Sequence, residues 1–235
     1  MTDLYLREWG AGDRIAVLVH GLTTDSTSWW QLGPALAERG YRVIAPDLPG
    51  HGHSPRAHTY TIEAMARALA EAVPHRPDLV IGHSLGALLL AHIVEDLLPD
   101  RVVYSDPAWG PGHPAMADMF QAQKPWTLEQ IRAATPRWAS AAQLGKLESL
   151  SRWDTNTLAI MDRFPGFHAA EPTVPSLVLL ADPSQVVSPE KGAQLAELGY
   201  QVRTVADTGH VIHNDDFPGF LTQLSDQIRY RLPSR

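Results

Sequence analysis

The sequence contains no cysteine, and this absence excludes several kinds of chemistry. Without a thiol the chain can form no disulfide, use no thiolate nucleophile and offer no cysteine ligand to zinc. Apolar runs of transmembrane length are also missing. The first residues, 1–4, show neither the basic region nor the apolar region of a secretory signal. We therefore expect a soluble protein of the cytoplasm.

Basic residues are in the minority. The 235 residues include 19 Lys and Arg against 26 Asp and Glu, which gives a formal net charge of −7 at pH 7. An acidic chain is repelled by phosphates, so we expect neither nucleic acid nor a membrane as a partner. The length suits one domain with a small insertion and allows a sizeable core. The expected oligomeric state is a monomer or a homodimer.

The pentapeptide Gly82-His83-Ser84-Leu85-Gly86 carries the strongest functional signal. It reads G-x-S-x-G, follows the apolar run 79–81 and precedes a predicted helix at 87–98. Strand, sharp turn and helix form the setting in which this pattern exposes a serine nucleophile. The N–H of Leu85 would then point toward the anionic intermediate that forms on Ser84. The alternative interpretation is an ordinary turn in which Ser84 caps the helix.

Apolar runs and turn signals predict alternating strands and helices along most of the chain. Strands are expected at 4–9, 15–19, 41–45, 79–83, 101–105, 177–180 and 200–205, and helices at 28–39, 61–73, 87–98, 189–198 and 216–231. This alternation implies an α/β fold, a mostly parallel sheet with helices on both faces. At 108–172 prolines, tryptophans and short helical pieces interrupt it. We interpret 108–172 as a helical cap inserted into a core of residues 1–107 and 173–235.

A serine hydroxyl needs a neighbouring base, and His210 is the best candidate. It lies in Thr208-Gly209-His210, directly after the last predicted strand. Because the carboxyl ends of parallel strands share one edge of the sheet, we expect His210 beside Ser84. His213 is the second candidate, although we expect it to lead into the last helix.

The base needs a carboxylate that fixes its tautomer, and two aspartates compete for this role. Asp106 ends the predicted strand 101–105, and Asp182 follows the strand 177–180. Either gives the chain order serine, aspartate, histidine. The oxyanion needs a second N–H donor, which we expect from Leu22, because Gly21 permits a close approach to the nucleophile strand.

Together these residues resemble the α/β-hydrolase superfamily. Four segments match it in order, namely His20-Gly21-Leu22 with Trp29 or Trp30 downstream, residues 46–54, residues 82–86 and residues 208–210. The resemblance implies that Ser84 is the nucleophile and His210 the base. It also implies that the N–H groups of Leu22 and Leu85 form the oxyanion hole and that a helical cap covers the pocket.

The turn that usually carries the acid departs from the superfamily pattern. Members commonly have Gly-x-x-Asp there, whereas this chain reads Ala181-Asp182-Pro183-Ser184. Ser184 occupies the usual acid position, and Asp182 lies two residues early. A minority of members, among them proteins like haloalkane dehalogenases and zearalenone lactonases, place the acid after the preceding strand, where Asp106 stands. We favour Asp106 and keep Asp182 as the alternative.

Other conspicuous residues receive structural interpretations. His51, His53 and His58 lack a nearby carboxylate and helical spacing, so we expect a structured loop and no metal site. His20 is expected to fix its loop through hydrogen bonds. The aromatic residues of 108–172 mostly form the cap's own core, and Trp109 is the best candidate for a contact with substrate.

The predicted function is that of a cofactor-free serine hydrolase. It would cleave a small, apolar carboxylic ester or lactone through a Ser84, His210 and Asp106 triad and an acyl-enzyme. One alternative is another reaction on the same machinery, such as C–C bond hydrolysis, perhydrolysis or a lyase reaction. The other is a small-molecule signal receptor with slow turnover, because a fold does not fix a function.

Overall fold

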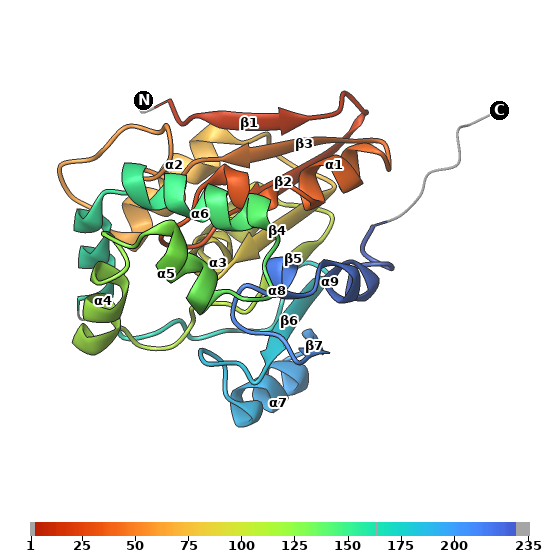
Figure 1. Ribbon diagram of the computed structural model, residues 1–235. Coiled ribbons are helices and arrows are strands. Elements are labelled where there is room, and N and C mark those ends of the chain that lie inside the picture. The colour runs from red at the N-terminus through yellow and green to blue at the C-terminus, as the bar shows by residue number, and fades with distance from the viewer. Residues whose placement is uncertain (1–2, 163, 229–235) are drawn as a thin grey trace.

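The computed structural model describes residues 3–162 and 164–228. Its strands form one seven-stranded sheet in the order β1-β3-β2-β4-β5-β6-β7 (Figure 1). The strands are β1 (Leu6–Trp9), β2 (Arg14–Val19), β3 (Tyr41–Pro46), β4 (Leu79–His83), β5 (Val102–Ser105), β6 (Ser176–Asp182) and β7 (Gln201–Ala206). Pairing is antiparallel between β1 and β3 and parallel across the rest of the sheet. The predicted α/β fold is confirmed.

The sheet separates two hydrophobic clusters, one on each face. Alternate residues of β2 show the division, because Val17 and Val19 join one cluster whereas Ala16 and Leu18 join the other. Helices α2 (Ile62–Ala72), α3 (Leu85–Leu97) and α7 (Pro189–Glu197) contribute to the first cluster. Helices α1 (Leu32–Ala37), α8 (Ile212–Asp215) and α9 (Phe217–Gln223) contribute to the second. Both faces of the sheet are covered, as continuous apolar strands require.

Two predicted helices differ from the structure. The helix expected at 28–39 is divided into the 3-10 helix η1 (Ser26–Trp29), which Asp25 caps, and α1. The division is possible because the Asp25 carboxylate satisfies the N–H of Thr27, so η1 begins two residues before the predicted start. The helix expected at 216–231 is shorter in the structure, where α9 ends at Gln223, and its positions 229–231 lie outside the described residues.

Four further helices lie between β5 and β6. They are α4 (Pro114–Gln121), α5 (Leu128–Ala134), α6 (Ser140–Arg152) and the 3-10 helix η2 (Thr155–Met161), and we call them the insert helices. Figure 1 shows α4, α5 and α6, in green, gathered on one side of the sheet. The division into a core and a cap, with boundaries at 107/108 and 172/173, remains a prediction. In the part of the chain that the structure describes, no helix is both long and apolar enough to cross a membrane.

Candidate active site

Ser84 joins β4 to α3 in a strained backbone conformation. Its φ of 51° and ψ of −113° lie where residues with a side chain are rare. Hydrogen bonds hold the turn in place, because Ser84 N donates to Ser105 O at 3.0 Å and Ala108 N donates to Ser84 O at 3.2 Å. The Ser84 side chain makes no capping hydrogen bond to α3. The geometry differs from that of an ordinary helix cap and is the one expected if Ser84 is the nucleophile; we call these residues, 82–86, the nucleophile turn.

The two glycines of the pentapeptide allow this turn. A Cβ on Gly82 would lie 2.7 Å from Ala87 N, and a Cβ on Gly86 would lie 2.3 Å from Val19 O. Real Cβ atoms do not approach backbone atoms so closely, so a side chain at either position would push α3 away from the sheet. The backbone of α3 thus begins in direct contact with β2 and β4.

Asp106 contacts the predicted base. It follows β5, is fully buried and has a φ of 42°. His210 Nδ1 donates a 2.7 Å hydrogen bond to Asp106 Oδ2, while Asp106 Oδ1 accepts from Ala181 N at 3.3 Å. With its proton held on Nδ1, the neutral imidazole presents Nε2 as an acceptor. The structure therefore brings together the two residues that a base and its orienting acid require.

Asp182 lies apart from this pair. It is the last residue of β6, pairs with Ala206 of β7 and has an exposed side chain. The hydrogen bonds and ion pairs of residues 3–162 and 164–228 include none between Asp182 and His210. Ser184, at the usual acid position, accepts hydrogen bonds from Val186 N and Val187 N and so stabilises its own turn.

His83 connects the turn at Ser84 to His210, a contact that the sequence reasoning missed. Its Nε2 donates to the carbonyl oxygen of His210 at 2.9 Å, and the two ring centroids lie 4.7 Å apart. Burial lowers the pKa of His83 well below its usual range, so this ring is neutral. Within the described residues, Ser84 and His210 themselves share no hydrogen bond, and such catalytic contacts commonly tighten only when substrate binds. The position of His83 inside the pentapeptide was the available signal.

His213 is a buried structural residue. It lies in α8, and its ring stacks on Trp29 with centroids 4.4 Å apart. Neither ring nitrogen has a hydrogen-bond partner in the described part of the chain. Burial lowers the pKa of His213 to about 3. A base needs an orienting partner, and His210 has one whereas His213 does not.

The two N–H groups predicted as oxyanion donors, those of Leu22 and Leu85, lie near the turn at Ser84 in the chain or in the fold. A Cβ on Gly21 would lie 3.2 Å from Ser84 Cβ, so the loop that carries Leu22 lies against the turn. His20 fixes this loop, because its Nδ1 donates to Gly21 O at 2.8 Å and its Nε2 accepts from Leu48 N at 2.9 Å. The prediction that His20 fixes its loop through hydrogen bonds is confirmed. Among the described residues, no acceptor takes the N–H of Leu22 or the N–H of Leu85.

The loop at residues 46–54 is held by its own polar groups. Asp47 accepts from Ser26 N at 2.7 Å and from His53 N at 2.8 Å. His51 is fully buried beside His20, and its Nδ1 donates to Pro49 O at 3.0 Å. Across residues 3–162 and 164–228, no three His, Asp or Glu side chains are arranged to hold a metal ion.

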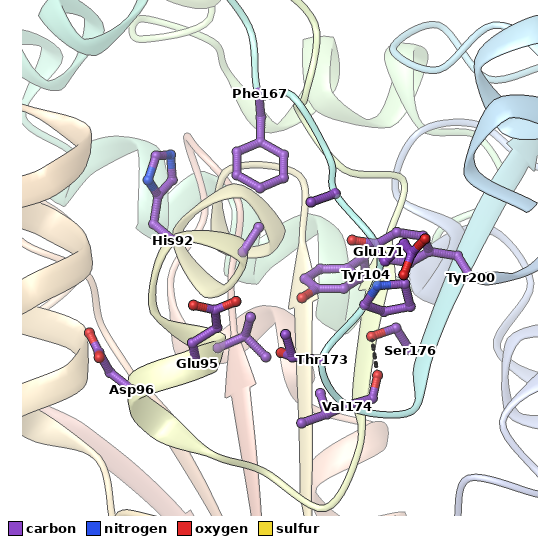
Figure 2. A pocket seen from close by; sticks show the side chains of 14 residues that line it. His92, Glu95, Asp96, Tyr104, Phe167, Glu171, Thr173, Val174, Ser176 and Tyr200 are labelled. Atoms are coloured by element: carbon purple, nitrogen blue, oxygen red, sulfur yellow. Dashed lines mark hydrogen bonds between the residues drawn. The ribbon is translucent and has the colours of Figure 1, made fainter. Parts of the chain in front are cut away.

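Trp109 is buried among other aromatic rings. Its side chain is 4% exposed and contacts Tyr104, Phe167 and Tyr200, with centroids 4.9, 5.3 and 5.9 Å away. Figure 2 shows these three residues around a cleft of about 170 Å³, which the second half of α3 also lines. Ser84 and its partners are not part of that lining. The contact of Trp109 with substrate remains a prediction.

Comparisons with known proteins agree with the fold. The sequence model of the "Alpha/beta hydrolase family" matches residues 16–222. Lipase LipV of Mycobacterium tuberculosis is 37% identical over 115 residues, which make up 46% of this chain and only 43% of the lipase. N-formylmaleamate deformylase of Pseudomonas putida is 28% identical over 97% of this chain and 93% of that enzyme.

Solved structures show the same fold. The crystal structure of an N-formylmaleamic acid deformylase from Pseudomonas putida S16 superposes with a TM-score of 0.77. The match covers 94% of each chain at 24% identity. A similarity at this level extends to the arrangement of strands and helices and leaves the substrate undetermined.

Proposed function

The chain belongs to the alpha/beta hydrolase family, and on that premise we propose that it is a hydrolase that cleaves a carboxylic ester or a lactone. The observation that carries this proposal is the 2.7 Å contact between Asp106 and His210 next to the strained turn at Ser84. Acyl transfer needs a nucleophile, a base, an orienting acid and two oxyanion donors. The residues gathered here can supply each of these groups.

The proposed reaction begins at Ser84. His210 Nε2 accepts the hydroxyl proton while Ser84 Oγ attacks the carbonyl carbon of the substrate. Asp106 holds His210 in the required tautomer and stabilises the imidazolium that forms. The N–H groups of Leu22 and Leu85 donate to the oxyanion, where preorganised donors contribute most because they need no rearrangement.

The second half of the reaction releases the acid. His210 donates its proton to the departing alkoxide, which leaves Ser84 acylated. A water molecule then loses a proton to His210 and attacks the acyl carbonyl. Collapse of the second intermediate frees the carboxylic acid and returns the proton to Ser84.

The relatives support ester cleavage, and one of them supports cleavage of a second type of bond. Lipase LipV supports ester cleavage, although its alignment spans less than half of that enzyme. The deformylase aligns along almost the whole chain, so hydrolysis of an amide-type C–N bond is the second candidate function. The same groups serve both reactions, since His210 can protonate an amine as readily as an alkoxide leaving group.

Esters and anilides with the same acyl group distinguish the two functions. We expect the protein to hydrolyse short p-nitrophenyl esters faster than the matching p-nitroanilides, with inhibition by a serine-directed phosphonate. Ser84→Ala should lower kcat for the esters by several orders of magnitude, as removal of a triad member does elsewhere. Faster anilide cleavage by the wild type would instead favour the second candidate.

Ser151→Ala is the matched control, because Ser151 is an exposed serine at the end of α6. It should keep the wild-type rate and react with the phosphonate, whereas Ser84→Ala should do neither. Phosphonate labelling of Ser84→Ala at the wild-type rate would refute Ser84 as the nucleophile.

A further inference from the structure

Helix α6 turns polar side chains toward the interior. Gln143, Lys146 and Ser149 are all buried on it. Polar groups buried in this way cost free energy unless they find partners. Gln143 Nε2 donates to Thr135 O at 2.9 Å, and Ser149 Oγ donates to Gly145 O at 2.8 Å, so both are satisfied within the insert. Lys146 differs from them because it reaches across to the core.

Lys146 binds the loop that carries one of the proposed oxyanion donors. Its Nζ donates to the carbonyl oxygen of Thr23 at 3.2 Å and to the Thr23 hydroxyl. Thr23 directly follows Leu22 and has a φ of 65°. On the other side of Leu22, Gly21 lies against Ser84. The ammonium group is therefore held on the loop that also contacts the turn at Ser84, two residues from Gly21.

Among the described residues, no carboxylate forms an ion pair with Lys146. In the described residues the ion pairs of Asp and Glu involve other cations. Asp25 is the buried carboxylate closest in sequence to Thr23, but its Oδ1 accepts from Thr27 and its Oδ2 faces Arg152 at 3.8 Å. Asp47 is occupied by two backbone N–H groups. The hydrogen-bond acceptors recorded for Lys146 are therefore two neutral groups of Thr23, its carbonyl oxygen and its hydroxyl.

An uncompensated buried ammonium is unfavourable. Burial lowers the pKa of Lys146 to about 7. The charge of Lys146 also contributes to lowering the pKa of His51, whose buried Nε2 has no partner among the described residues. An ammonium has three N–H donors, and an anion is the partner that would stabilise it most.

We propose that Lys146 binds a carboxylate on the acyl group of the substrate, so that the enzyme prefers acid-bearing esters over neutral esters of similar length. The acyl group is the relevant part because the oxyanion loop contacts the carbonyl that belongs to it. This inference rests on the proposed function and changes the expectation of a wholly apolar substrate. If Lys146 only held Thr23 in place, its loss would slow all esters by the same factor.

The test compares p-nitrophenyl hydrogen adipate with p-nitrophenyl hexanoate, with the buffer rates subtracted. We expect a higher kcat/KM for the adipate half-ester in the wild type. Lys146→Met should lower the ratio of the two kcat/KM values by about 10- to 100-fold, the range for a charge-assisted hydrogen bond. Lys146→Gln can still donate to Thr23 but has no charge, and it should lower the ratio similarly.

Lys124→Met is the matched control, because Lys124 donates to backbone oxygens of Leu150, Ser151 and Trp153 and not to Thr23. It should leave the ratio unchanged. Ser84-dependent cleavage of both esters without an adipate preference, or a preference that Lys146→Gln retains, would overturn the inference and leave the proposed function standing.

A binding measurement is independent of turnover. Titration calorimetry with monomethyl adipate should show binding to Ser84→Ala and at least about tenfold weaker binding to Ser84→Ala/Lys146→Met. If no ester is cleaved, the proposed function fails, but this measurement still shows whether Lys146 binds a carboxylate. Equal affinity of the two variants would refute it.

Discussion

The histidines around Ser84 differ because each has a different partner. His210 donates to the Asp106 carboxylate, His83 donates to the backbone of His210, and His213 has no partner among the described residues. A hydrogen bond to a carboxylate both orients an imidazole and stabilises its cation, whereas a bond to a carbonyl oxygen mainly orients it. The partner therefore decides which histidine can act as a base.

The first prediction concerns the acid. Asp106→Asn should lower kcat for a p-nitrophenyl ester by about 10³- to 10⁴-fold, because an amide favours the wrong imidazole tautomer. Asp182→Asn should remain near wild type, since the exposed Asp182 side chain lies apart from His210. Both rates are measured under identical conditions. A severe loss in Asp182→Asn together with an active Asp106→Asn would reverse the assignment.

The second prediction concerns His213. His213→Phe should keep the stack on Trp29 and remove two buried nitrogens without partners. We expect near wild-type ester turnover and an increase of about 1 kcal/mol in the free energy of unfolding in urea. His210→Ala provides the contrast and should lose nearly as much activity as Ser84→Ala. An inactive His213→Phe that is fully folded would show that His213 takes part in catalysis.

The sequence predicted most of this site but not all of it. Ser84, His210 and the loop at His20 follow from local patterns at strand ends. The choice between Asp106 and Asp182 did not follow from local patterns, because both follow predicted strands. Only the structure shows that Asp106 contacts His210 and that Asp182 ends β6 with an exposed side chain. Lys146 gave no signal, since its contact with Thr23 spans 123 positions and a lysine in a polar helix is expected at the surface.

At the scale of elements, local signals predicted the strands better than the helices. Strands buried on both faces are continuous apolar runs, and these are visible in the sequence. The region 28–39 was predicted as one helix although it contains Gly33 and Pro34, and the cap at Asp25 starts a separate short turn at Ser26. Helix α6 has little apolar character on its buried face, so periodicity alone could not orient it.

The third prediction concerns the start of α2, where Thr61 is the N-cap. Its side chain caps the helix, because Ala64 N donates to Thr61 Oγ1 at 3.1 Å. Thr61 is exposed, so the cap is the main interaction that its side chain makes. Thr61→Ala should lower the free energy of unfolding by about 1 kcal/mol and Tm by about 2–4 °C. Thr61→Ser keeps the oxygen and should retain stability in the same thermal melt, and equal melting of both variants with wild type would refute the cap.

At the scale of the whole molecule, buried histidines make the fold sensitive to acid. Burial lowers the pKa values of His20, His51, His83 and His213 in the folded protein. In the unfolded chain these groups return to a pKa of about 6.5 and bind more protons below it. Their contribution to stability is therefore complete above about pH 6.5 and is lost as the pH falls toward 3.

The fourth prediction follows from this linkage. The free energy of unfolding, measured in urea from pH 7.5 to pH 5, should fall by about 1.4 kcal/mol per pH unit for each histidine that stays neutral in the fold. His213→Phe should make the fall in the free energy of unfolding per pH unit smaller by the contribution of about one histidine. His58→Gln, at an exposed position, should leave that fall unchanged. A flat profile in the wild type between pH 6.5 and pH 5 would contradict the prediction.

The dyad of Asp106 and His210 joins positions 104 residues apart. A ribosome that synthesises this chain at about 5–20 residues per second would add His210 roughly 6 to 25 s after Ser84. Through that interval the nascent polypeptide holds its nucleophile without a base, and the base cannot be oriented until β7 has joined the sheet. Catalysis would therefore begin only when the last strand is in place, and the first appearance of turnover would mark the completion of folding.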